Sequence, residues 1–95
     1  MDAKKLNEEP VYVISIAARL ADVHPQTLRI YERKGLLEPA RTQGGSRRYS
    51  DEDIEMLQRI QDLTAEGHNL EGVRRILQLE GEIEALQGQI DALRQ

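Results

Sequence analysis

Hydrophobic residues recur at helical spacing in four stretches of the chain. We expect helices over residues 16–22, 25–34 and 51–66, and a fourth helix that begins after Asn69. Their inward-facing residues are predicted to be Ile16, Ala17, Leu20, Leu28, Ile54, Leu57, Ile60, Leu63, Leu70, Val73, Ile76 and Leu77. Polar caps, a proline and glycines mark the helix ends: Ser15, Pro25, Gly35, Ser50 with Asp53, Gly67 and Asn69. The pattern predicts a mainly α-helical domain.

Two shorter segments lack helical periodicity. Residues 11–14 are β-prone, and residues 41–49 have the pattern of a hairpin that turns at residues 43–45. Because this hairpin follows two helices joined by a tight turn, the order of elements predicts a winged helix-turn-helix with a small β wing. The polar, aperiodic residues 1–10 are expected to form a disordered tail.

Isoleucine and leucine alternate at coiled-coil spacing in the last third of the chain. One seam, spaced 3, 4, 3, 4, 3, is formed by Ile76, Leu79, Ile83, Leu86, Ile90 and Leu93. A seam with β-branched a and leucine d positions favours two paired helices in parallel coils. We therefore expect residues 79–95 to form a dimerisation helix, with contacts from Leu79, Ile83, Leu86, Ile90 and Leu93. The alternative is one amphipathic helix that folds back on its own domain. Since the seam spans only two to three heptads, we expect either a truncated coil or additional dimer contacts.

Charge is distributed unevenly along the chain. The net formal charge is −1 over residues 1–10, +4 over residues 11–50 and −7 over residues 51–95. A basic block beside an acidic block favours a local face that binds a polyanion, and a solvated charge mosaic is the simpler alternative. The absence of cysteine excludes disulfides and thiolate metal sites in these residues. No apolar run approaches the roughly 20 residues that span a bilayer.

The second predicted helix carries side chains suited to reading DNA. One face, at spacing i, i+3, i+4, i+7, is formed by Gln26, Arg29, Ile30 and Arg33. In the major groove, arginine bonds O6 and N7 of guanine as a fork, and glutamine does the same for adenine. Gln26 and Arg29 are therefore candidates for base contacts. Arg33 and Lys34, near the helix end, are candidates for phosphate contacts.

The predicted hairpin supplies a second basic element, whose small tip residues let the backbone approach another surface. Arg47 and Arg48 alternate sides of a strand, so only one can point fully outward, against a phosphate or into a minor groove. The other is expected to bridge to the acidic residues 51–53, and the pattern leaves open which is which. Tyr49 is either a core residue or a phosphate ligand. The complete set of candidate DNA-contacting residues is Gln26, Thr27, Arg29, Ile30, Tyr31, Arg33, Lys34, Arg41, Gly45, Arg47, Arg48 and Tyr49.

These motifs resemble the MerR family of bacterial transcription regulators. The carrying residues are 14–18, the run TLRIYERKGLL at 27–37, Pro39, Arg41, RYS at 48–50, Gly67 and Leu70. The likeness covers roughly residues 11–79 and predicts a MerR-type DNA-binding domain over residues 11–78. It is closest to the heat-shock repressors of the HspR type, through VYVIS, HPQTLR and GGSRRYS. The family pattern often has tyrosine where this chain has Ile30, which leaves Tyr31 to supply an aromatic contact.

The resemblance implies a homodimer joined by an antiparallel coiled coil. Such a dimer binds an inverted repeat, with the recognition helices in major grooves about one helical turn or more apart. The resemblance also implies a cytoplasmic, nucleoid-associated repressor of chaperone genes, with the DnaK chaperone as co-repressor. Ligand-binding members carry a sensor domain after the coil, and metal-sensing members use cysteines near it. Because this chain ends within the predicted coil and has no cysteine, we expect no cofactor and no metal.

An enzyme is not expected. His24 and His68 both precede predicted helices and are expected to be turn or cap residues. No phosphate-binding glycine loop and no nucleophile–base pair is visible. The acids at positions 80, 82 and 84 lie around a helix rather than converging on one point.

Alternatives to a transcription repressor stay open. An excisionase-like factor that bends DNA shares the winged fold, and a protein-interaction module with acidic helices would need no DNA. At the level of single residues, Arg29 and Arg33 can instead be solvated side chains paired with Glu32 or Glu38.

Overall fold

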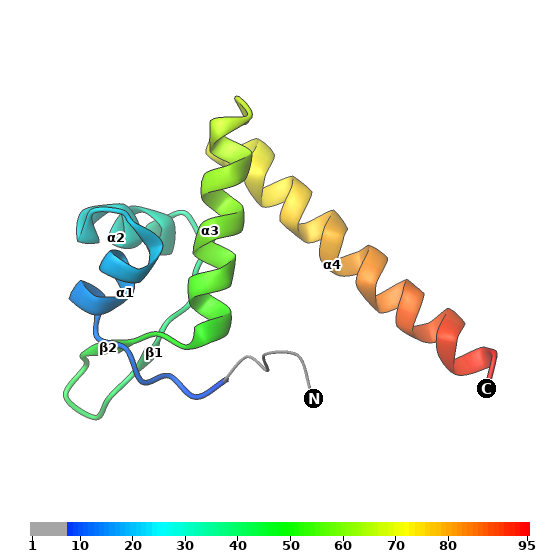
Figure 1. Cartoon of the computed structure of the whole chain (residues 1–95), viewed down its shortest axis with the longest axis horizontal. Helices are drawn as coiled ribbons and strands as arrows, with labels where there is room; N and C mark the ends of the chain where they lie inside the picture. The colour runs from blue at the N-terminus through cyan, green and yellow to red at the C-terminus, as the bar shows by residue number, and fades with distance from the viewer. Residues whose placement is uncertain (1–7) are drawn as a thin grey trace. The chain divides into compact units, whose positions relative to one another are not determined.

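The computed structural model of the chain describes residues 8–95, so most of the predicted tail over residues 1–10 lies outside the described residues. Along these residues the elements are α1 (Ile14–Ala21), α2 (Pro25–Arg33), β1 (Ala40–Arg41), β2 (Arg47–Arg48), α3 (Asp51–Ala65) and α4 (Leu70–Leu93), as Figure 1 shows. The chain divides into two compact units, Met1–Asp62 and Leu63–Gln95. A mainly helical chain with one small antiparallel sheet confirms the predicted fold class.

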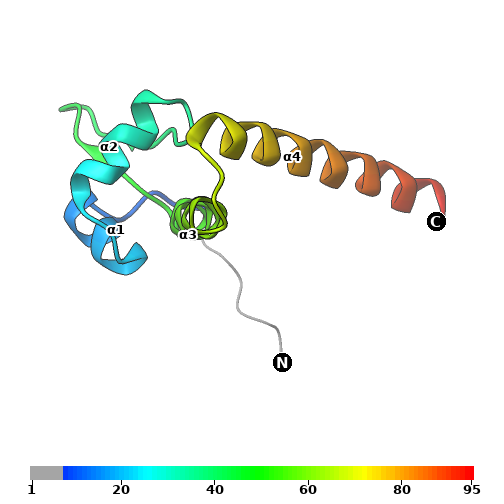
Figure 2. The same cartoon turned by 90° about the horizontal axis from the view of Figure 1, so that it is seen from above.

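The first unit is built around helices α1 and α2 and the part of α3 up to Asp62. Figures 1 and 2 show α1 and α2 on the same side of α3. The Gln61 side chain donates to the Ala21 carbonyl at 3.1 Å, which ties α3 to the end of α1. Buried hydrophobic residues of this unit are Ala17, Ala18, Ala21, Leu28, Tyr31, Leu37, Tyr49, Leu57 and Ile60. The core is thus small and largely aliphatic.

The first helix differs from the prediction in its start and in its buried face. It begins at Ile14, and the carbonyl of the N-cap residue Val13 accepts from the next turn, so the prediction that Ser15 caps the helix is wrong. Ile16 and Leu20, which were expected to face inward, are 37% and 48% exposed. The buried face is formed by Ala17, as predicted, together with Ala18 and Ala21, because small side chains let α1 approach its neighbours closely.

Most predicted helix ends are confirmed. The backbone N–H of Ser50 donates to Asp53 Oδ2 at 2.9 Å, and the N–H of Asp53 donates to Ser50 Oγ at 3.1 Å, which forms the expected capping box of α3. Asn69 Oδ1 accepts from the N–H of Gly72 at 2.8 Å and caps α4. Gly35 ends α2 with a φ of 77°, a conformation that glycine adopts without steric cost.

The β-prone run contributes less than a strand. Tyr12 alone pairs with Tyr49 as an isolated antiparallel bridge, through backbone bonds of 2.9 and 2.8 Å. The Tyr12 hydroxyl also donates to Asp51 Oδ1 at 2.6 Å, and this bond raises the pKa of the tyrosine. The segment before α1 is therefore fastened to the residues that join the hairpin to α3.

Candidate nucleic-acid interface

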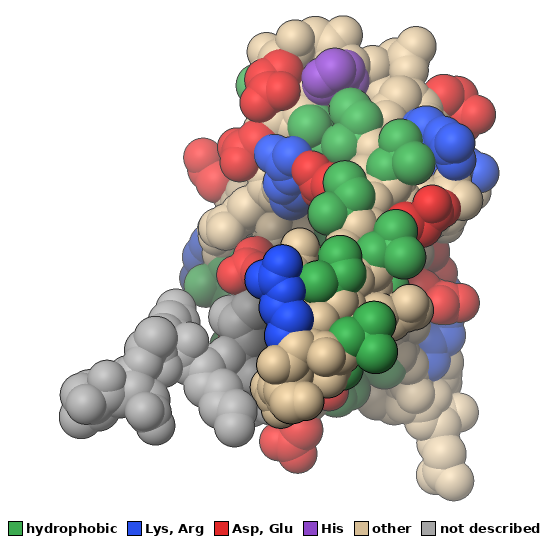
Figure 3. Space-filling model, turned by 90° about the vertical axis from the view of Figure 1, so that its right-hand side faces the viewer, with side chains coloured by type: hydrophobic (Ala, Val, Ile, Leu, Met, Phe, Trp, Pro, Cys, Tyr) green, Lys and Arg blue, Asp and Glu red, His purple; other side chains and the backbone are tan. Residues whose placement is uncertain are grey.

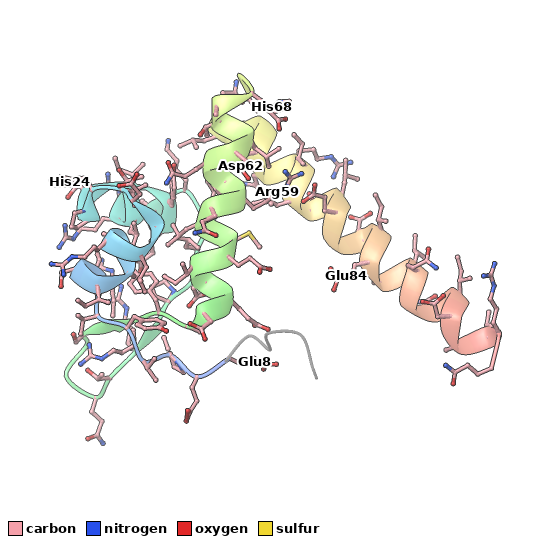
Figure 4. All side chains as sticks on the ribbon, viewed as in Figure 1. Glu8, His24, Arg59, Asp62, His68 and Glu84 are labelled. Carbon is pink, nitrogen blue, oxygen red and sulfur yellow. The ribbon has the colours of Figure 1, made fainter. Side chains whose placement is uncertain are left out.

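Helix α2 begins at a turn that its own sequence specifies. Pro25 occupies the first helical position, where its missing N–H leaves no intrahelical bond unmade. The Nδ1 atom of His24 accepts from the backbone N–H of Gln26 at 3.0 Å, so His24 is the predicted cap residue; Figure 4 labels it beside the helix start. Leu28 and Tyr31, 0% and 7% exposed, anchor the inner face.

The opposite face of α2 displays the predicted base-reading residues. Gln26 and Arg33 are exposed, and Arg29 and Ile30 are half-buried. Arg29 Nη1 donates to Gln26 Oε1 at 3.3 Å, so the two candidates for base contacts lie side by side. Their remaining donors and acceptors can meet neighbouring base edges in a major groove. The expected Tyr31 contact is less favourable, because that side chain is almost fully buried.

The basic hairpin has the predicted turn. Its strands pair Ala40 with Arg48 and Arg41 with Arg47. The N–H of Gly45 donates to the carbonyl of Thr42 at 2.9 Å, and Gly45 has a φ of 86°. A Cβ at Gly45 would meet nothing within 4 Å, so glycine is required there by backbone conformation and not by lack of space.

One carboxylate joins the hairpin to α2. Glu32 Oε2 accepts from Arg41 Nη2 at 2.6 Å, and Glu32 Oε1 accepts from Arg47 Nε at 2.5 Å. The bond from Arg47 holds the pKa of Glu32 below its ordinary value. Partial burial of the carboxyl raises this pKa, and the bond from Arg41 lowers it further. We refer to Glu32, Arg41 and Arg47 as the wing clamp. From the sequence, Glu32 was expected only as a possible partner of Arg29 or Arg33 in its own helix, and not of the hairpin arginines.

The wing clamp corrects the prediction for the two adjacent arginines. Arg47 is the bridging residue, but its partner is Glu32 in α2 and not the acidic start of α3. Arg48 donates to Ser46 Oγ at 2.8 Å and to the Arg47 carbonyl at 2.9 Å, and both acceptors are neutral. Successive side chains of a strand point to opposite faces, so Arg47 and Arg48 point in different directions and Arg47 is the one directed toward α2.

The sequence left open whether Tyr49 is a core residue or a phosphate ligand, and the structure shows a core residue. Its side chain is 0% exposed, and its hydroxyl has no hydrogen-bond partner in the part of the chain that the structure describes. Burial raises the pKa of this hydroxyl. Tyr49 is therefore a core residue that directly follows β2 and anchors the base of the hairpin.

Helix α4 in the second unit presents the predicted seam. Figure 3 shows hydrophobic side chains gathered in a band on one face of the molecule. The large hydrophobic residues of α4 that are exposed are Leu79, Ile83, Leu86, Ile90 and Leu93. Glu84, labelled in Figure 4, is also exposed. The structure thus leaves the predicted dimerisation residues open to a partner.

A helix-turn-helix with an arginine-bearing second helix and a basic hairpin defines the class of winged helix-turn-helix proteins. Residues 12–80 match the model of the MerR HTH family of regulatory proteins, and the chain belongs to this family. Membership of a family of regulators agrees with the expectation that the chain is not an enzyme.

Individual relatives agree with this assignment. The chain is 50% identical over 94 residues to the putative heat shock protein HspR of Streptomyces coelicolor, and this match covers 92% of the chain and 62% of the relative. It is 40% identical over 70 residues to the transcriptional repressor CarH of Myxococcus xanthus, of which it covers 23%. The chain thus spans less than two thirds of the length of either relative.

Solved structures show the same architecture. The lead(II) complex of PbrR691 from Ralstonia metallidurans matches with a TM-score of 0.70 and 32% identity, over 88% of this chain and 73% of that one. HiNmlR, a MerR family regulator bound to promoter DNA, matches with a TM-score of 0.64 and 26% identity, over 87% of this chain and 75% of that one. Among the helices described here, none has the length and apolar character needed to cross a membrane.

Proposed function

We propose that the chain is a sequence-specific DNA-binding transcription regulator that acts as a homodimer on an inverted repeat. The observation that carries this proposal is the paired display of Gln26 and Arg29 on the outer face of α2, beside a basic hairpin tied to the same helix. A helix with these side chains fits the major groove, and the hairpin fits the flanking backbone. The promoter complex of HiNmlR supports DNA as the ligand.

The seam of α4 is the proposed dimer contact. Two copies that pair through Leu79, Ile83, Leu86, Ile90 and Leu93 bury side chains that one chain leaves exposed. A two-fold pair also presents two α2 helices, which matches a palindromic site. The division into a DNA-binding domain over residues 11–78 and a dimerisation helix over residues 79–95 belongs to this proposal.

Selection from random-sequence DNA tests the base-reading assignment. The chain should enrich one inverted repeat, with an affinity that falls steeply as salt rises, because phosphate contacts release counterions. Arg29→Ala should cost about 1–3 kcal/mol of binding and relax the preference at one base pair in each half-site. Arg19→Ala, which removes the same charge from an exposed position on α1, should leave the ranking of site variants intact. If Arg29→Ala also leaves that ranking unchanged, Arg29 does not read a base.

We further propose a cytoplasmic repressor of chaperone genes with DnaK as co-repressor. This narrower proposal rests on the HspR-type motifs VYVIS, HPQTLR and GGSRRYS, and the 50% identity to a putative heat shock protein HspR supports it. Footprinting on fragments of the source genome, with and without purified DnaK, tests this narrower proposal. A protected inverted repeat upstream of chaperone genes, strengthened by DnaK, is expected. Protection that does not respond to DnaK would remove the co-repressor.

A further inference from the structure

The wing clamp places a negative charge where a DNA-binding surface should be positive. Glu32 lies in α2, three residues after Arg29, and its side chain is only partly exposed. Each carboxylate oxygen takes an arginine from a different strand, Arg41 from β1 and Arg47 from β2. Arg41 Nη1 also donates to the carbonyl of Gly45 at 3.0 Å, so the connection extends from α2 to the hairpin tip.

The hairpin is too short to hold its own position. Its strands pair at two positions, with one further backbone bond from the N–H of Thr42 to the carbonyl of Ser46 at 2.9 Å, and a two-stranded hairpin of this size is at best marginally stable alone. The backbone bridge between Tyr12 and Tyr49 holds the base of the hairpin, whereas Gly45 lies at the far end. Within the described residues, the wing clamp connects α2 to the hairpin tip, because Arg41 bonds both to Glu32 and to the carbonyl of Gly45.

The clamp also determines which donors remain for DNA. The Nε atom of Arg47 donates to Glu32, whereas its two terminal nitrogens bond to no acceptor within residues 8–95. A guanidinium with its inner nitrogen held and its outer fork open is pre-oriented for a phosphate, since less side-chain freedom is lost on binding. Glu32 thus orients a cation that it partly neutralises.

We propose that Glu32 is a positioning residue that sets the wing against the base-reading face of α2, so that both engage one half-site together. This inference rests on the proposed function. The competing view makes Glu32 a plain negative charge that repels phosphate. The two views predict opposite signs for operator binding, because loss of a repelling charge strengthens binding to every duplex, whereas loss of a positioning contact weakens binding to the cognate duplex alone.

Binding of Glu32→Gln to two duplexes separates these views. The first duplex, of about 30 base pairs to hold two half-sites and flanks, is the one that the wild-type chain selects from a random library, and the second is its scramble. We expect cognate affinity to fall about tenfold and scrambled affinity to stay equal or rise, so the specificity ratio falls at least tenfold. Parallel gains on both duplexes, or an unchanged ratio, would overturn the proposal.

Glu38→Gln is the matched control. Glu38 is exposed and lines the same pocket as Glu32, and its replacement by glutamine removes the same charge. Arg41 and Arg47 bond to Glu32 and not to Glu38. The specificity ratio of Glu38→Gln should equal that of the wild type. The Nε–H resonance of Arg47 provides a direct signature, since it should move in Glu32→Gln and stay in place in Glu38→Gln. A resonance that is unaffected by Glu32→Gln would contradict the clamp.

A shorter acid keeps the test decisive if Glu32→Gln does not fold. Glu32→Asp retains the charge and withdraws the carboxylate by one methylene, so the specificity ratio should fall at least threefold; an unchanged ratio would overturn the proposal. If the wild-type chain selects no sequence, the proposed function fails together with this inference. If selection succeeds and the variants keep the wild-type ratio, the inference alone fails.

Discussion

Replacing Leu86 by alanine should weaken self-association of the chain by one to two orders of magnitude. Leu86 lies at the centre of the seam and is 57% exposed in the single chain. Full burial of a leucine side chain contributes about 1.5–3 kcal/mol, so burying the exposed part contributes about 1–1.5 kcal/mol per chain. A symmetric dimer loses this contribution twice, about 2–3 kcal/mol in total, which raises the dissociation constant roughly 30- to 150-fold.

Sedimentation equilibrium over a range of concentrations measures this change. Gly88→Ala is the control, because position 88 lies on the outward side of the heptad and a Cβ there would meet nothing within 4 Å. Because alanine favours the helix over glycine by about 0.5–1 kcal/mol, Gly88→Ala should increase helix content without weakening the dimer. Equal dissociation constants for Leu86→Ala and the wild type would refute the seam, and so would a wild-type chain that stays monomeric throughout.

Three further predictions concern the DNA-binding unit, and chemical denaturation measures all of them. Tyr49→Phe should raise the free energy of unfolding by about 1 kcal/mol, because it removes a buried hydroxyl that lacks a partner; a clear loss would mean that the hydroxyl is bonded. His24→Ala should lower it by about 0.5–1 kcal/mol through loss of the α2 cap, and His24→Asp should restore it. Because the folded-state pKa of Glu32 lies below the ordinary 4.5, the clamp stabilises the fold above pH 4.5 and is lost as pH falls through the folded value. Glu32→Gln should lack this component of the acid dependence, and identical pH profiles would contradict the clamp.

Local signals in the sequence predicted the helix ends well. The capping box of Ser50 and Asp53, the Asn69 cap and the terminal Gly35 each depend on residues within one turn of each other. Such short-range geometry is visible in the sequence. The seam of α4 was predictable for the same reason, since a heptad repeat places its members on one face whatever the rest of the fold does.

Long-range packing determined what the sequence did not show. Hydrophobic size predicted that Ile16 and Leu20 face the core, but the closeness of the neighbouring helices selects the alanine face of α1. The partner of the bridging wing arginine, which the structure identifies as Arg47, was misassigned because Glu32 is distant in sequence, whereas the acids at residues 51–53 are near. The available signal was Glu32 itself, the only acid between Asp22 and Glu38, because its position beside Arg33 and Lys34 indicates a carboxylate paired with cations.

In the proposed complex, two copies of α2 read successive turns of one duplex. Methylation interference at guanine N7, on the duplex selected by the wild-type chain, tests it most directly, since arginine reads that atom in the major groove. We predict two mirrored clusters of interfering guanines, about 10–10.5 base pairs apart or at a multiple of that spacing, on one face of the helix. A single cluster, or interference without two-fold symmetry, would contradict paired reading of the duplex by two α2 helices.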